Sequence, residues 1–156
     1  MKTQTLEPFK IAYIRLTGPY GEGIPQAMEK IGEWAKSHDI PDANRVHIFH
    51  DDPDVTPAEA CRADIGMMVP EDVETPHDIA LQEIPAGEYA TLRKIVTEFS
   101  QYGEMWQNLM EQIEASDSHM GDGPCFELYH TCDEQATDVS VYISLCNDQS
   151  SQKQQA

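Results

Sequence analysis

Two segments with helical periodicity, each preceded by one strand-like segment and followed by two more, constrain the fold of this chain more than any other feature. The first is Ile24–Ser37 and the second covers residues 98–115, and apolar side chains recur along one face of each. Thr97 is the predicted N-cap of the second helix. Bulky, alternating residues predict the strands, which cover residues 9–16, 45–50, 61–69, 89–94, 125–131 and 138–145.

The order strand, helix, strand, strand therefore occurs twice, which indicates an internal duplication. Setting Ala12 beside Ala90 also sets Arg15 beside Arg93 and Met28 beside Trp106. Two half-sheets, each covered by one helix, are expected to pair into a single antiparallel sheet with both long helices on one face. The predicted class is α+β, with a central cleft between the duplicated halves that suits a ligand.

A length of 156 residues predicts a single domain, which we place at residues 1–147. Residues 148–156 form a polar tail that is expected to be disordered. The N-terminal residues show no apolar core of a signal peptide, and no apolar run approaches the length of a membrane span, so a cytoplasmic protein is expected. The four cysteines lack CxxC spacing and are expected to be reduced.

The charge of the chain is strongly negative. There are 28 Asp and Glu residues against 10 Lys and Arg residues, which gives a formal net charge of -18. This excess argues against direct contact with nucleic acid, because phosphates would be repelled. It is compatible with cations or basic protein surfaces as partners, but simple solubility is the interpretation that we favour for the charge as a whole.

The segment PCFELYH, residues 124–130, places the acid Glu127 inside an apolar run. On a strand, Cys125 and Tyr129 share its face, while Phe126 and Leu128 point the other way. A carboxylate among apolar groups loses hydration, and a bound cation would restore its charged form. The aromatic residues proposed to complete a pocket for a cationic, hydrophobic molecule are Tyr129, Tyr142, Trp106 and Tyr89.

Two alternatives to this pocket stay open at the level of the sequence. Glu127 could lie on a solvated sheet face, or it could be paired with Arg15 or Arg93. Trp106 lies on a helical stripe that equally suits core packing, and either face of the strand that carries Tyr142 could line the pocket.

Other site chemistries find little support in the sequence. His47 and His50 are three residues apart, which sends them to opposite faces of a strand, and the acidic turn that follows lacks the spacing of a calcium loop. No metal and no cofactor are predicted. The chain has neither a GxSxG nor a GxxxxGK[ST] pattern, so nucleophilic catalysis and a phosphate loop are not expected.

Several pieces of the chain, in their order, resemble the GyrI-like small-molecule-binding family. They are AYIRLTGPYG, HDDPDVTPAEACRADIG, IPAGEYATLRK, and PCFELYH followed by TDVSVYISL, within residues 8–146. The family includes DNA gyrase inhibitors and effector-binding domains of multidrug-sensing and arabinose-type transcription regulators. The resemblance implies a duplicated strand–helix–strand–strand fold, and it gives Glu127 the role of the acid that meets a cationic ligand. This chain departs from many relatives at residues 96–100, VTEFS, where they carry a Gly-Pro-Tyr turn.

The hypothesis that follows is a ligand-binding protein, a sensor or sequestering module for lipophilic cationic small molecules. A second hypothesis is a DNA gyrase inhibitor that acts by protein contact, and the resemblance also makes a DNA-binding regulator a candidate partner. A third is a hydrolase of strained electrophilic natural products, with Glu127 activating a water. The sequence favours binding over catalysis.

Overall fold

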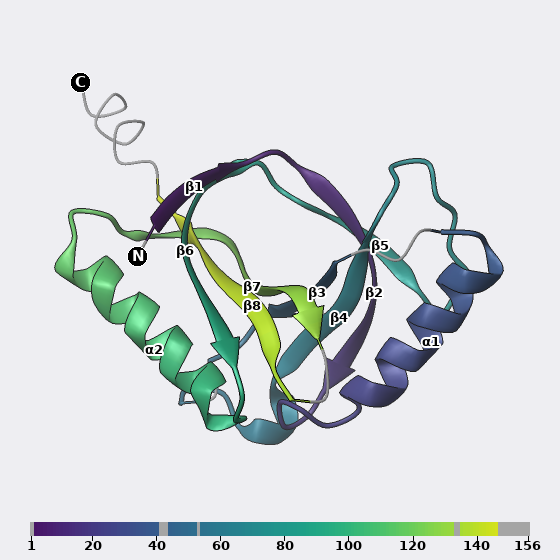
Figure 1. Cartoon of the computed structure of the whole chain (residues 1–156), viewed down its shortest axis with the longest axis horizontal. Coiled ribbons are helices and arrows are strands. Elements are labelled where there is room, and N and C mark those ends of the chain that lie inside the picture. The colour runs from purple at the N-terminus through teal and green to yellow at the C-terminus, as the bar shows by residue number, and fades with distance from the viewer. Residues whose placement is uncertain (1, 41–43, 53, 133–134, 147–156) are drawn as a thin grey trace. The chain divides into compact units, whose positions relative to one another are not determined.

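The computed structural model of the protein describes residues 2–40, 44–52, 54–132 and 135–146 (Figure 1). Contacts within the chain group it into two compact units. The first unit is Pro8–Ile84, and the second unit combines Met1–Glu7 with Pro85–Ala156. Within its described residues, each unit contains one long helix and four antiparallel strands, so the predicted α+β class and the duplicated order of elements are confirmed. The cleft expected between the halves stays a prediction.

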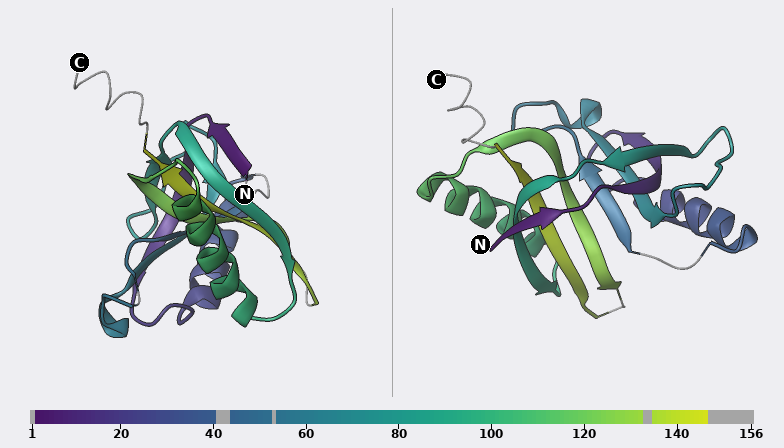
Figure 2. Two further views of the ribbon diagram at one scale, coloured as in Figure 1. Left: turned by 90° about the vertical axis from the view of Figure 1, so that its left-hand side faces the viewer. Right: turned by 90° about the horizontal axis from the view of Figure 1, so that it is seen from above.

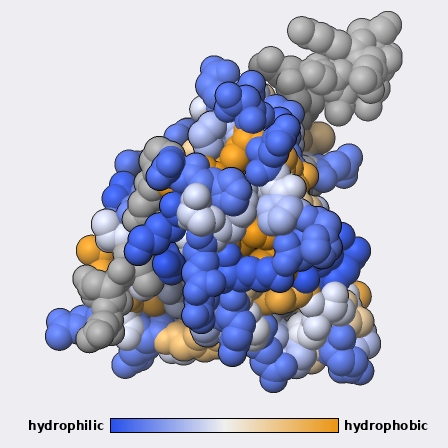
Figure 3. Space-filling view, turned by 90° about the vertical axis from the view of Figure 1, so that its right-hand side faces the viewer, coloured by the Kyte–Doolittle hydropathy of each residue, from blue (hydrophilic) through white to orange (hydrophobic). Residues whose placement is uncertain are grey.

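The first unit packs its helix on one face of a sheet with the strand order β3-β4-β2-β5. Its elements are β2 (Phe9–Thr17), α1 (Ile24–Ser37), β3 (Arg45–Phe49), the short 3-10 helix η1 (Ala58–Ala60), β4 (Arg62–Val69) and β5 (Ala80–Ile84). Four α1 residues, Ala27, Ile31, Trp34 and Ala35, are buried against the sheet, as the apolar periodicity predicted. The surface on this side is largely hydrophilic, with small apolar areas (Figure 3).

The second unit has the strand order β1-β6-β8-β7. Its elements are β1 (Lys2–Leu6), β6 (Gly87–Val96), α2 (Ser100–Ala115), β7 (Met120–Cys132) and β8 (Thr137–Leu145). The buried side of α2, formed by Met105, Leu109 and Ile113, packs on apolar residues of β6 and β8. None of the helices in the described part of the chain is long and apolar enough to cross a membrane.

Two further strands, β1 and β5, each precede one repeat in the sequence but pair with the first strand of the other repeat. β1 precedes β2 but pairs with β6, and β5 precedes β6 but pairs with β2. Figure 2 shows β1 running alongside β6. Each unit is therefore completed by a strand that lies, in the sequence, just before the repeat of the other unit.

Three local predictions are corrected by the structure. β1 was not predicted, and its side chains are largely exposed, so it lacks the apolar alternation of a half-buried strand. The strand predicted at residues 125–131 is longer than expected, because β7 already begins at Met120. Glycines allow this strand to lie close to β8, since a Cβ at Gly123 would come within 2.6 Å of Ser144 Oγ. The tail expected at residues 148–156 lies outside the described residues.

The third correction concerns the start of α2. Thr97 is not its N-cap, because the helix begins at Ser100 and the N-cap residue is Phe99. The side chain of Gln101 instead accepts hydrogen bonds from the backbone N–H groups of Thr97, at 2.6 Å, and Glu98, at 3.1 Å. The side chain of Gln101 thus fixes the backbone just before the helix, and no side-chain hydrogen bond caps the helix at Phe99.

Candidate functional site

Glu127 lies on β7, on the face of the second unit's sheet that packs against α2. Its register partner on β8 is Val141, a core residue of that face. Cys125 and Tyr129 also contact this core, as the alternation along the strand predicted. Only 4% of Glu127 is exposed, so the alternative of a solvated sheet face is wrong.

Two neutral groups donate hydrogen bonds to the buried carboxylate. Trp106 Nε1 of α2 lies 2.8 Å from Glu127 Oε2, and the Tyr129 hydroxyl lies 2.6 Å from Oε1. Burial raises the pKa of Glu127, and the hydrogen bonds from Tyr129 and Trp106 offset only part of that rise. The structure therefore brings together three predicted site residues, Glu127, Trp106 and Tyr129. Among the described residues, no neighbouring positive charge compensates this acid.

Both arginines that were alternative partners of Glu127 bind other carboxylates. Arg93 donates two hydrogen bonds to Asp138, at 2.9 and 2.7 Å. Arg15, in the first unit, donates two to Asp64, at 2.7 and 3.0 Å. The alternative in which an internal guanidinium neutralises Glu127 is therefore wrong as well.

The other two predicted site residues lie on the opposite face of the same sheet. Tyr142 is the register partner of Phe126, and their rings stack with centroids 4.8 Å apart. Tyr89 meets both rings edge to face and donates a 2.8 Å hydrogen bond to the carbonyl oxygen of Pro85. All three rings are buried. Tyr89 and Tyr142 thus form an aromatic cluster that the sheet separates from the Glu127 carboxylate.

Asp64, which was not among the predicted site residues, is a second fully buried carboxylate. It lies on β4 and accepts hydrogen bonds from Arg15, from His50 at 2.7 Å and from Gln82 at 2.8 Å. The available signal was its position in the apolar run ADIGMMV, which resembles the position of Glu127 in PCFELYH. The amino-acid sequence alone does not indicate that Asp64 forms ion pairs with basic side chains and that Glu127 has only neutral partners in the described part of the chain.

The histidines of β3 and its end lie in different surroundings. His47 is buried, and burial lowers its pKa to about 4, so the ring is neutral at pH 7. His50 contacts Asp64. No group of three or more His, Cys, Asp and Glu side chains suited to a metal ion occurs within the described ranges.

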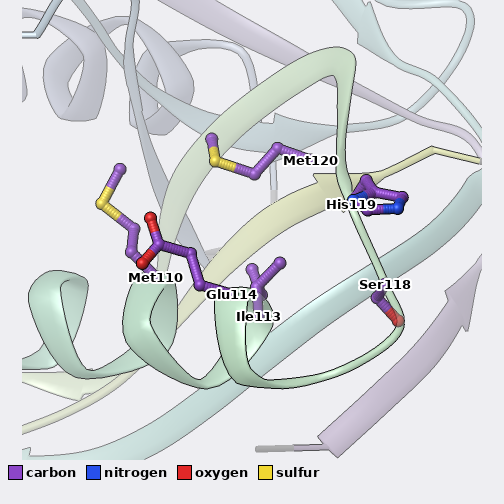
Figure 4. A pocket seen from close by; sticks show the side chains of 6 residues that line it. All are labelled: Met110, Ile113, Glu114, Ser118, His119 and Met120. Carbon is purple, nitrogen blue, oxygen red and sulfur yellow. The ribbon is translucent and has the colours of Figure 1, made fainter.

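A hollow of about 420 Å³ lies at the C-terminal end of α2 (Figure 4). Its lining residues are Met110, Ile113, Glu114, Ser118, His119 and Met120. Glu127 is not one of them. A ligand can therefore reach the Glu127 carboxylate only if the side chains that cover it move.

The chain is thus an α+β protein built from two repeats, with an acid buried under α2. The chain belongs to the family of GyrI-like small molecule binding domains, whose sequence model matches residues 1–145. Its relatives include a DNA gyrase inhibitor of Yersinia enterocolitica, 30% identical over 92% of this chain and 95% of that protein. A second, from Escherichia fergusonii, is 31% identical over 76% of this chain and 79% of that protein.

Two solved structures share the fold over nearly the whole chain. The C-terminal domain of EcmrR matches with a TM-score of 0.77 at 13% identity, over 94% of this chain and 96% of that domain. SAV2435 bound to tetraphenylphosphonium matches with a TM-score of 0.61 at 11% identity, over 96% of this chain and 95% of that protein. The match to the family model confirms the family that the sequence pieces predicted.

Proposed function

We propose that this protein binds lipophilic organic cations and that Glu127 is their counter-charge. The observation that carries the proposal is a carboxylate only 4% exposed that receives hydrogen bonds from two neutral donors, Trp106 and Tyr129. Removing a carboxylate from water is costly unless an opposite charge compensates it. A positively charged ligand supplies that compensation, and burial strengthens the attraction.

The carboxylate is covered by side chains that are themselves near the surface. Trp106 and Tyr129 are each partly exposed, so Glu127 lies one side chain below solvent. We infer that a ligand displaces one or both rings from the carboxylate and then packs against their faces. Cation–π contact with such rings contributes about 0.5–2 kcal/mol each, and apolar contact must supply most of the remaining affinity.

The fold similarity agrees with this chemistry. SAV2435 has been solved with tetraphenylphosphonium, a bulky hydrophobic cation. At 11% identity, the likeness extends to the fold, so the ligand class is carried here by the surroundings of Glu127.

Tetraphenylphosphonium and neutral triphenylphosphine oxide are the paired probes for this proposal. We expect the cation to bind, the oxide to bind more weakly, and Glu127→Gln to weaken cation binding roughly five- to thirtyfold, or about 1–2 kcal/mol. Glu104→Gln is the matched control, because it makes the same charge change at an exposed position of α2. Equal binding of the cation by the parent and Glu127→Gln proteins in a tryptophan-fluorescence titration would refute the electrostatic role.

A second candidate function is inhibition of DNA gyrase by protein contact. It is supported by relatives named DNA gyrase inhibitor that align with 92% and 76% of this chain. The net charge of -18 suits a basic protein surface that otherwise holds DNA. In a supercoiling assay with purified gyrase, we expect inhibition that weakens steeply as salt increases, because salt screens exposed charges. Unimpaired supercoiling at low salt would reject this function. Inhibition of gyrase also requires that the protein be located in the cytoplasm.

Hydrolysis of a strained electrophile stays a hypothesis for the same acid. It would require Glu127 to activate a water once the covering rings have moved. Catalytic release of product from such a compound, abolished by Glu127→Gln, would distinguish hydrolysis from binding alone.

A further inference from the structure

The hollow at the end of α2 is a built feature of the second unit rather than a gap in a loop. Three of its lining residues, Met110, Ile113 and Glu114, occupy one side of the helix at spacings of three and four residues. The other three, Ser118, His119 and Met120, follow the helix directly. The volume of about 420 Å³ falls within the range of small-molecule sites.

Hydrogen bonds hold the two walls of the hollow in place. After the helix ends, the Ser116 hydroxyl donates to the Ile113 carbonyl oxygen at 2.7 Å and accepts from the Ser118 N–H at 3.1 Å. The backbone N–H of Cys146 donates to the His119 carbonyl oxygen at 2.8 Å, which ties the second wall to the end of β8. The hollow is therefore formed before any ligand arrives.

Negative groups predominate at the end of α2 that borders this hollow. The carbonyl end of a helix carries a partial negative charge that lysine or arginine usually offsets. The last turn of α2, all of which is described, contains Glu114 and no basic residue. No lysine or arginine occurs anywhere from Ile95 to Gln152 in the sequence. A cation at the hollow would relieve this accumulation of negative charge.

The walls combine this charge with apolar, polarisable groups. In Figure 4 the thioethers of Met110 and Met120 and the carboxylate of Glu114 lie at one side of the hollow, and Ser118 and His119 lie at the other. Both methionines are exposed although they are large and apolar, at 39% and 47%. Thioethers adapt to irregular apolar ligands. The combination suits a cation whose charge is surrounded by alkyl groups better than a hydrated metal ion.

We propose that this hollow is a second cation site, which binds alkylated ammonium groups between the methionine thioethers and the Glu114 carboxylate. It is separate from the site proposed at Glu127, and its occupancy does not depend on that site. Because Glu114 is exposed, the contact is partly screened by solvent, and we expect the site to be weak.

The test follows the methionine methyl groups by NMR of protein labelled with methyl-¹³C methionine. Of the seven methionine methyl signals, those of Met110 and Met120 are assigned with Met110→Leu and Met120→Leu variants. Tetraethylammonium chloride is the probe, and sodium chloride at equal ionic strength is its control. We expect saturable shifts of the Met110 and Met120 methyl signals with the probe only.

Three charge variants separate this site from its alternatives. Glu114→Gln is expected to weaken the titration about three- to tenfold. Glu111→Gln is the matched control, because it removes the same charge from the same helix at an exposed position that does not line the hollow. Glu127→Gln should leave these shifts unchanged within about twofold. Shifts that do not saturate, or equal weakening by Glu114→Gln and Glu111→Gln, would overturn the proposal in favour of a diffuse charge effect.

Discussion

At the scale of single residues, the chain contains two buried carboxylates with opposite surroundings. Burial by itself raises the pKa of Asp64, but the hydrogen bonds from Arg15, His50 and Gln82 outweigh it and lower the pKa below its ordinary value. Burial also raises the pKa of Glu127, and its two neutral donors do not reverse that effect. Basic side chains therefore compensate the charge of Asp64 within the fold, whereas, among the described residues, only neutral groups contact the carboxyl group of Glu127.

The stability of the protein should report the raised pKa of Glu127. A carboxyl whose pKa is raised by folding contributes stability below its unfolded pKa, and that contribution is lost as the pH rises through the folded pKa. Relative to the parent, Glu127→Gln should therefore gain stability as the pH rises above the ordinary pKa of a glutamate, because the amide has no charge to bury. Urea unfolding at several pH values measures this difference. A difference that does not change with pH would show that the pKa is not raised.

The two arginine pairs provide a matched comparison. Arg15→Gln removes the guanidinium from a fully buried acid and should lower the free energy of unfolding by roughly 2–4 kcal/mol. Arg93→Gln breaks a more exposed pair with Asp138 and should cost markedly less, because solvent screens that contact. Because folding lowers the pKa of Asp64, the Arg15→Gln effect should shrink as the pH falls through the acid range. Equal losses in urea unfolding would contradict the difference in burial.

At the scale of helices and strands, the sequence predicted the elements that bury one regular face. The boundaries of α1 agree with the prediction, because apolar residues recur there at helical spacing. β1 escaped notice, because its exposed, polar residues gain their order from pairing with β6, which is distant in sequence. The start of β7 escaped notice because Gly121, Gly123 and Pro124 are typical of a turn, and only the close approach to β8 explains them.

The candidate site was predictable only in part. Alternation along β7 placed Tyr129 beside Glu127, and the helical stripe of α2 turned Trp106 toward the sheet. The face of Tyr89 and Tyr142 depends on the register of β6 and β8, which a single sequence does not specify. The pairing of Arg15 with Asp64 likewise depends on the register of β2 and β4.

Two glycines in different elements should respond in opposite ways to an added methyl group. A Cβ at Gly66 on β4 would collide with the carbonyl oxygen of Ala12 and lie 2.9 Å from the Cβ of Tyr13. Gly66→Ala should therefore destabilise the protein by about 1–3 kcal/mol. Gly103 in α2 has open space around that position, so Gly103→Ala should stabilise by about 0.5–1 kcal/mol. Thermal unfolding of both variants checks the signs, and a stabilising Gly66→Ala would contradict the close approach of β2 and β4.

At the scale of the whole molecule, the duplication preserves the scaffold and not the chemistry. The register of β3 against β4 pairs Ile48 with Asp64, and the register of β7 against β8 pairs Leu128 with Ser140. When Ile48 and Leu128 are taken as equivalent positions of the two repeats, the preceding residues, His47 and Glu127, are equivalent too. The first unit thus holds a neutral imidazole where the second holds an acid, which explains why a cation site is proposed under only one of the two helices.

Removal of β1 should increase local unfolding in the second unit and leave the first unit largely unchanged. Deleting residues 1–7 takes away the antiparallel partner of β6, whose amide groups would then face solvent along one edge. Hydrogen exchange measured by mass spectrometry should accelerate in β6 by about tenfold or more, with little change in β2–β5. Acceleration spread evenly over both units would contradict the assignment of β1 to the second unit alone.

The positions of β1 and β5 in the sequence also determine the order in which a nascent chain can fold. Residues 8–84 are contiguous, so the first unit can form as soon as Ile84 has left the ribosome. β1 is synthesised before all of them, yet its partner β6 follows only afterwards. β1 therefore remains unpaired while the first unit is completed after it, and its polar side chains make it a poor template for pairing with other chains during that time.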